Sequence, residues 1–204
     1  MLAVTGGKGG TGTTVTTLGL AAALGSDAAA ADADWTLPNL HALARVGRSW
    51  PDDGLPERRA DDRDLRSVGP PPVVVPAPPA PGERDRGAVL RRLAARPSPT
   101  AVDTPSGVGP PAVLPIRVAD GVVVTTTACA PAIRGAEKSA AIAAAVGTPV
   151  VAVAVTRAAR VPSPVATRFD APATAVPSAE PPVLARDRVA DAYERLATAV
   201  ESVA

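Results

Sequence analysis

Residues 4–15, VTGGKGGTGTTV, decide the fold of this chain. The stretch nearly spells a phosphate-binding loop, a motif that ends in Gly-Lys-Ser/Thr. Here Gly12 is followed by Thr13 and Thr14, and the lysine of the stretch, Lys8, stands five positions before Thr13. The stretch therefore keeps the glycines and the hydroxyls of the motif but lacks the lysine at its usual position.

The glycine stretch lies where a phosphate-binding loop requires it, after a strand candidate (residues 1–5) and before a helical run (residues 14–24). Glycines permit backbone angles that turn amide N–H groups toward an anion. The following helix adds the positive end of its dipole, and Thr14 occupies the position whose hydroxyl ligates Mg²⁺. The glycines of the stretch are Gly6, Gly7, Gly9, Gly10 and Gly12.

The composition predicts one globular domain over residues 1–204. Hydrophobic residues make up 46% and charged residues 20%, and because aromatics are only 2% the core must be built from Ala, Val and Leu. A net charge of +1 provides no global attraction to nucleic acid or anionic lipid. One cysteine excludes an intramolecular disulfide. We find no signal-peptide or membrane-span pattern and expect a cytoplasmic protein.

Short apolar runs alternate with helical patterns along the chain, and this alternation predicts βαβ units. We therefore expect an α/β fold with a mostly parallel central sheet flanked by helices. Expected strands are residues 1–5, 27–32, 72–77, 100–103, 121–126, 149–155 and 173–176. Expected helices are residues 14–24, 84–96, 133–146 and 187–203.

Two regions fit this alternation poorly. Residues 47–83 are charged and then proline-rich, and they could be a partner-binding polyproline segment or a surface insertion that flanks one strand. We favour the insertion, because such connections need no ligand. Residues 158–172 are expected to form a loop.

The loop sequence GGKGGTGTT resembles the deviant P-loop of the MinD/ParA ATPases, whose pattern is Lys-Gly-Gly-Thr/Val-Gly-Lys-Thr. Lys8 matches the extra, signature lysine of that family, and Thr13 stands where the ordinary P-loop lysine belongs. Further motifs follow in the family's order. They are DADWTLPNL (32–40) for the first switch, AVDTPSGVG (101–109) for the second, the later strands ADGVVVTTT (119–127) and VAVTRAAR (153–160), and AVPSAE (175–180) near the base.

The resemblance implies ATP and Mg²⁺ as cofactors and assigns a role to each matching residue. Asp34 would orient the attacking water, and Lys8 would reach the nucleotide of a partner subunit. The metal would be held by Thr14, by Asp103 through water, and by Asp32 in the surroundings of the metal. The implied nucleotide contacts are Gly7, Lys8, Gly9, Gly10, Thr11, Gly12, Thr13, Thr14, Val15, Arg157 and Pro177.

The departure at Thr13 weakens the predicted chemistry. The missing ammonium would span the β- and γ-phosphates and neutralise charge during transfer. Losing such a donor costs about 3–4 kcal/mol, or roughly two to three decades in rate. Either hydrolysis is slow or absent, or a second cation such as Arg134 substitutes. We favour the first reading.

Three function classes remain open. The first is an ATP-dependent dimerising switch in cell division or spatial positioning, paired with itself or with a paralogue. The second is a degenerate scaffold that regulates active paralogues, and the third is a small-molecule enzyme on the same fold. The mixed charge of the C-terminal run argues against membrane binding, and a DNA-binding arginine patch is possible but less favoured than a solvated surface. The lone Cys129 is expected to be a small buried residue.

Overall fold

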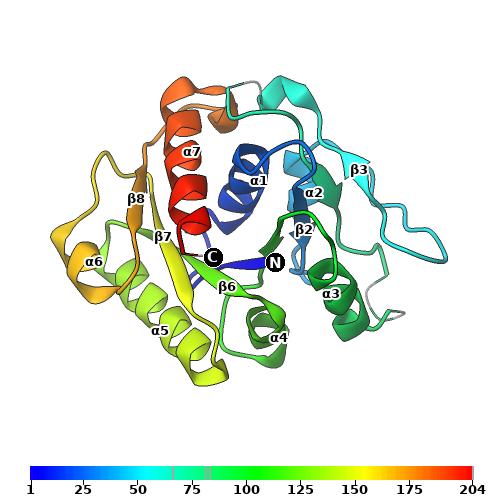
Figure 1. The fold of residues 1–204 in the computed structure, drawn as a ribbon, viewed down its shortest axis with the longest axis horizontal. Coiled ribbons are helices and arrows are strands. Elements are labelled where there is room, and N and C mark those ends of the chain that lie inside the picture. Colours follow the sequence, from blue (N-terminus) through cyan, green and yellow to red (C-terminus); the bar gives the residue numbers. More distant parts are fainter. Residues whose placement is uncertain (66, 81, 83, 204) are drawn as a thin grey trace.

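Eight strands form one central sheet in the computed structural model of the chain, which describes residues 1–65, 67–80, 82 and 84–203 (Figure 1). The order across the sheet is β3-β4-β2-β5-β1-β6-β7-β8, and the pairings are parallel except for β3 with β4. The mostly parallel α/β prediction is confirmed. The strands are β1 (Leu2–Gly6), β2 (Ala29–Asp32), β3 (Arg58–Arg59), β4 (Val73–Val75), β5 (Thr100–Asp103), β6 (Gly121–Thr127), β7 (Val150–Thr156) and β8 (Ala173–Val176).

Helices cover both faces of the sheet (Figure 1). They are α1 (Thr13–Ala23), α2 (Leu40–Leu43), α3 (Arg86–Ala94), α4 (Pro110–Val118), α5 (Ala130–Val146), α6 (Ser163–Arg168) and α7 (Asp187–Glu201). Successive strand residues point to opposite faces. Val4 therefore packs in the cluster that contains α1 and α7, while Ala3 packs in the cluster that contains α4 and α5.

Small residues let the layers approach closely, which compensates for the shortage of aromatic side chains. Gly19 of α1 faces the ring of Tyr193 on α7, and a Cβ at Gly19 would lie 2.6 Å from that ring. Tyr193 is fully buried, and its hydroxyl lies 3.4 Å from Thr16 Oγ1. Glycine at position 19 thus allows one of the few large side chains to fill the space between two helices.

Helices α2, α4 and α6 are absent from the helices expected from the sequence. The three prolines of α4 argue against a helix, yet Pro110 and Pro111 lie in its first turn, where a missing N–H costs nothing. Pro115 lies inside the helix, and burial of that face (Ala112 and Ile116) stabilises the helix despite its low propensity. Likewise α6 forms inside the predicted loop 158–172, with Val165 buried.

The strand predicted at residues 72–77 is present as β4, and much of the chain that flanks it within residues 47–83 is exposed, as at residues 51–54, 57–59 and 79–80. Residues 72–78 are buried around β4, and the indole Nε1 of Trp50 donates to the Pro76 carbonyl at 3.0 Å. The guanidinium of Arg48 donates to the carbonyls of Ala77 and Pro78. Pro72, Pro76 and Pro78 therefore belong to the buried layer around β4.

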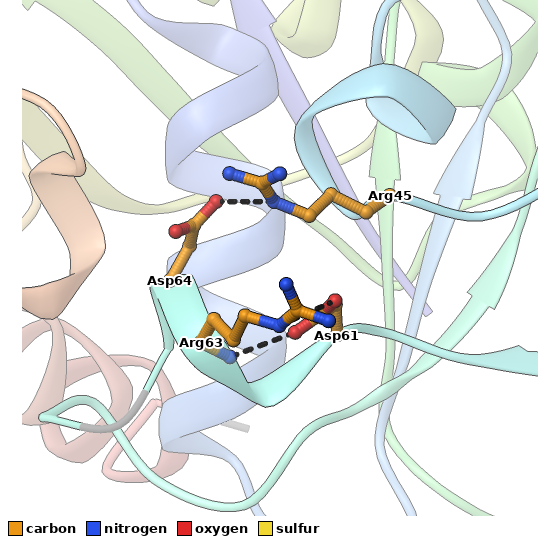
Figure 2. Close-up of polar contacts among 4 residues, drawn as sticks. All are labelled: Arg45, Asp61, Arg63 and Asp64. Carbon is orange, nitrogen blue, oxygen red and sulfur yellow. Dashed lines mark hydrogen bonds and ion pairs between the residues drawn. The ribbon is translucent and has the colours of Figure 1, made fainter.

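Charged residues between positions 45 and 64 form local ion pairs (Figure 2). Arg45 Nε donates to Asp64 at 2.9 Å, which links the end of α2 to the short 3₁₀ turn η1 (Asp62–Asp64) beside α1. Asp61 caps that turn by accepting from the Arg63 amide. Exposed pairs of this kind contribute at most about 1 kcal/mol, so the buried strand β4 contributes more to holding the segment.

None of the described helices combines the length and the apolar character needed to cross a membrane.

Replacing Gly19 with valine is expected to destabilise the protein by about 1–3 kcal/mol, because the added side chain must displace the buried ring of Tyr193. Urea unfolding measures the change. Gly47→Ala is the control, since a Cβ there meets open space. Equal stability of the Gly19→Val protein and the parent would contradict the close packing of α1 on α7.

Candidate functional site

The glycine loop joins the carboxyl end of β1 to the first turn of α1. Gly10 and Gly12 have φ values of 81° and 87°, a left-handed conformation that glycine adopts without the steric cost that other residues meet. Gly12 is the residue directly before α1, and no side chain caps this helix end. The first amides of α1 therefore lack intrahelical partners and present their N–H groups to the loop.

Buried threonine side chains bond the loop to the central sheet. Thr11 Oγ1 lies 3.0 Å from Thr125 Oγ1 of β6, and Thr125 in turn donates to the Thr5 carbonyl. Thr156 of β7 donates to the Thr11 carbonyl at 2.7 Å. The loop, which continues β1, is thus also bonded to β6 and β7, and these bonds hold its backbone in place without a ligand.

Helix α5 supports the loop through a contact between two glycines. A Cβ at Gly7 would lie 1.8 Å from the carbonyl oxygen of Gly135, and a Cβ at Gly135 would lie 3.0 Å from the carbonyl carbon of Gly7. Side chains at either position would push the loop away from α5. The pair therefore sets how deep the loop lies in the molecule.

Thr14 and Asp103 meet at the centre of the site. Thr14 Oγ1, in the first turn of α1, donates to Asp103 Oδ2 at 2.6 Å, at the carboxyl end of β5. Asp103 is only 3% exposed. Within the described residues its second oxygen, Oδ1, has no hydrogen-bond partner. A buried, unpaired carboxylate oxygen beside a hydroxyl suits a hydrated cation, which can supply both positive charge and a donor.

Asp32 lies beside Asp103, because β2 and β5 pair these two residues in register. Burial, followed by the charge of Asp103, raises the pKa of Asp32 to about 7. Burial also raises the pKa of Asp103 to about 6, against the lowering effect of the Thr14 and Thr13 hydroxyls. Both carboxyl groups are therefore shielded from water. A cation bound beside them would reduce the repulsion between their charges.

Asp32 also organises the segment after β2. Its carboxylate accepts from the amides of Asp34 and Leu40, at 3.0 and 3.2 Å. Asp34 in turn accepts from the amides of Thr36 and Leu37. These bonds fold residues 32–40 into a tight turn that carries Asp34 near the two buried carboxylates.

A cavity of about 210 Å³ lies on the other side of Gly12. Arg157 and Pro177, both predicted from the sequence, line this cavity. Arg157 has a φ of 54° and donates to the Gly10 carbonyl, which ties the cavity to the loop. Tyr193 and Val183 also line the cavity, and no local pattern pointed to either, since the chain brings them in from its C-terminal part.

Lys8 is exposed in the glycine loop. Its charge contributes to lowering the pKa of the Cys129 thiol, although the hydroxyl of Thr127 has the larger effect. Cys129 is exposed, which corrects the expectation of a buried residue. It precedes α5 directly, where the chain turns from β6 into the helix.

The structure brings most of the sequence-predicted residues to one edge of the sheet. Residues 7–12 form the loop and residues 13–15 begin α1. Thr14 contacts Asp103, which lies next to Asp32, and Arg157 and Pro177 line the cavity beside Gly12. Arg134 is exposed on α5. Among the described residues, no cluster of three or more His, Cys, Asp and Glu side chains could hold a metal by itself.

No protein-family model matches the sequence, and no curated protein matches it either. Solved structures do match over nearly the whole chain. The septum site-determining protein MinD complexed with Mg-ADP from Pyrococcus horikoshii OT3 has a TM-score of 0.81 at 19% identity, covering 99% of this chain and 96% of that one.

Two further solved structures are similar over nearly the whole chain. An ATP complex of a McdA variant from Cyanothece has a TM-score of 0.69 at 13% identity, with 98% of this chain and 95% of that chain covered. Cobyrinic acid a,c-diamide synthase from Mycobacterium smegmatis, with bound ATP analog and magnesium, has 0.70 at 20%, covering 97% and 92%. The chain therefore has the fold of the MinD-like P-loop ATPases, as the sequence resemblance predicted.

Because of the contact between Gly7 and Gly135, two variants of the loop are expected to differ in their free energy of unfolding. Gly7→Ala is expected to lower the free energy of unfolding by about 1–3 kcal/mol, because its methyl group meets the backbone of α5. Gly9→Ala is the matched control and should change it by no more than about 0.5 kcal/mol, since its methyl group meets open space. Thermal unfolding without nucleotide checks both, and equal effects would contradict the support from α5.

Proposed function

We propose that the chain is a MinD/ParA-like switch that binds Mg-ATP at the glycine loop, pairs with a second copy, and hydrolyses the nucleotide slowly. One observation gives this proposal its main support. The Thr14 hydroxyl and a buried Asp103 carboxylate with an unpaired oxygen meet below an uncapped helix N-terminus. This arrangement suits a cation and an anion together, as a magnesium nucleotide would supply.

Magnesium fits the residues present. Thr14 would be a direct ligand, Asp103 Oδ1 would accept from a metal-bound water, and Asp32 would add negative charge behind them. Magnesium keeps several waters and takes few protein ligands, so phosphate oxygens would complete the set. When bound, the ion would neutralise charge on the phosphates and so favour attack by water.

The loop amides would hold the phosphates of the nucleotide. Residues 7–15 offer backbone N–H groups together with the dipole of α1, and the threonine bonds and the Gly7–Gly135 contact keep these groups in place. The base would enter the cavity lined by Arg157 and Pro177. We assign Arg157 a positioning part, because it donates to Gly10.

Asp34 would orient the attacking water, since its segment lies at the same edge as Asp103. Thr13 offers a hydroxyl in place of the ammonium that would span the phosphates. We therefore expect turnover roughly 100- to 1000-fold below that of a loop with the lysine.

Dimerisation is supported by the exposure of apolar side chains around the site. Leu37 follows β2 and is 71% exposed, and Val108 follows β5 and is 70% exposed. The carboxyl ends of these parallel strands lie at one edge of the sheet, where Lys8 is exposed too. A second copy placed there would cover both side chains and receive Lys8 at its nucleotide.

A role in cell division or spatial positioning is the biological setting we favour, because the similar structures include a septum site-determining MinD and McdA. An ATP-dependent switch also needs the nucleotide pool of the cytoplasm, where we place the protein. The alternative is a scaffold that binds but does not hydrolyse ATP, and Thr13 is the residue that favours it.

Calorimetric titration with Mg-ATPγS and Mg-ADP, combined with light scattering, tests the proposed function. We expect micromolar binding and a shift from monomer to dimer with Mg-ATPγS alone. Thr14→Ala is the matched variant, because it removes the hydroxyl next to Asp103 and should weaken binding at least about tenfold. No binding at millimolar nucleotide would refute the proposal, and binding without dimerisation would favour the scaffold.

Restoring the lysine tests the explanation for slow turnover. Thr13→Lys is expected to raise the rate of ATP hydrolysis roughly 100-fold or more, as measured by phosphate release. Thr13→Met adds length without charge and should leave the rate low. An unchanged rate in Thr13→Lys would mean that another cation already serves, and Arg134→Gln would then identify it by a loss of turnover.

Cys129 provides a label for the proposed interface, because it is exposed and near Lys8. Alkylation by a maleimide is expected to slow at least about fivefold with Mg-ATPγS, and the protection should increase with protein concentration. Mg-ADP serves as the control. Protection that is independent of protein concentration would argue that nucleotide alone covers the thiol.

A further inference from the structure

Arg86 contacts the segment that carries Asp34. It is the first residue of α3, and its guanidinium carbon lies 4.7 Å from the centre of the Trp35 ring. Its Nη1 donates to the Ala33 carbonyl at 3.4 Å. Ala33 and Trp35 are the two sequence neighbours of Asp34, so one side chain contacts the chain on both sides of that aspartate.

Trp35 is also held at the edge of its ring. The residue is 5% exposed, and its Nε1 donates to the Asp32 carbonyl at 3.1 Å. The indole is thus bonded to the end of β2 through its Nε1 and stacked on by the guanidinium of Arg86. Because the Asp34 carboxylate bonds to amides of its own turn, its direction follows the path of residues 33–37.

Electrostatic attraction between Arg86 and Asp34 adds to the stacking of Arg86 on Trp35. Burial lowers the pKa of Arg86, while the Asp34 carboxylate acts in the opposite direction, so the two side chains attract each other. Arg86 also borders an open groove of about 520 Å³ together with Val108, from the segment that follows β5. Arg86 therefore contacts the Asp34 segment that follows β2 and also borders the groove that Val108 lines.

We propose that Arg86 is the positioning residue that keeps the Asp34 segment closed over the nucleotide site, through its stack on Trp35 and its bond to Ala33. The catalytic consequence rests on the proposed function, which gives Asp34 its task. The contact itself needs no nucleotide. It can therefore be measured even in a protein that hydrolyses nothing.

The contact is tested in a Trp50→Phe background, which leaves Trp35 as the one tryptophan of the chain. In Arg86→Met, we expect acrylamide quenching of Trp35 to rise at least about twofold and hydrogen exchange at residues 34–37 to speed up about tenfold. A cation–π contact shifts an equilibrium by roughly five- to thirtyfold when it is partly desolvated. Arg86→Lys should restore part of the effect, since it keeps the charge but loses the planar stack.

Arg84→Met is the matched control, because Arg84 stacks on residue 50 in the same way, at 4.8 Å from the Trp50 ring in the parent chain. It should leave Trp35 quenching and exchange at 34–37 unchanged. Unchanged values in Arg86→Met would overturn the proposal. Equal changes in Arg84→Met and Arg86→Met would also overturn it, since they would indicate general loosening near α3.

Measuring kcat and the Kd for nucleotide separately distinguishes a positioning role of Arg86 from a role in nucleotide binding. Arg86→Met should lower kcat about tenfold and leave the Kd for Mg-ATPγS within about twofold, because the contacts of Arg86 are to the Asp34 segment. A parallel loss of affinity and turnover would overturn the positioning role. If the parent protein binds no nucleotide, the proposed function fails, and the quenching and exchange data still decide whether Arg86 holds the segment.

Discussion

The close contact between the backbones of Gly7 and Gly135 is the constraint on which the site depends. It lets the glycine loop settle against α5 with no side chain between them, at a depth where Thr11 reaches Thr125 and Thr156. At that depth the first turn of α1 also brings the Thr14 hydroxyl to Asp103. A loop displaced by one methyl group would loosen the threonine bonds and the Thr14–Asp103 contact together, because one rigid backbone connects them.

Electrostatic repulsion is the second feature of the site. Asp32 and Asp103 are buried next to each other at the ends of β2 and β5, and both have raised pKa values of about 7 and 6. Such an arrangement costs stability in the empty protein, since ionised carboxyl groups are poorly solvated there. A bound magnesium nucleotide would offset this cost, and the repulsion thereby favours the loaded state that the proposed switch requires.

Much of the fold followed from local patterns. Apolar runs of four to seven residues predicted the parallel strands, because a strand buried on both faces needs side chains of one kind throughout. The expectation failed where tertiary burial outweighed local propensity. Helix α4, which is absent from the expected helices, holds Pro115 inside it because the helix buries Ala112 and Ile116.

The sequence by itself determined the glycine loop, the order of the acidic motifs and the missing lysine at Thr13, since these depend on spacing within a short stretch. Only the tertiary structure decided which side chains surround them. The stack of Arg86 on Trp35, the glycine at position 135 beneath the loop and Tyr193 in the cavity all join residues about 50 or more positions apart. Such contacts leave no local pattern, because they arise when helices pack on the sheet.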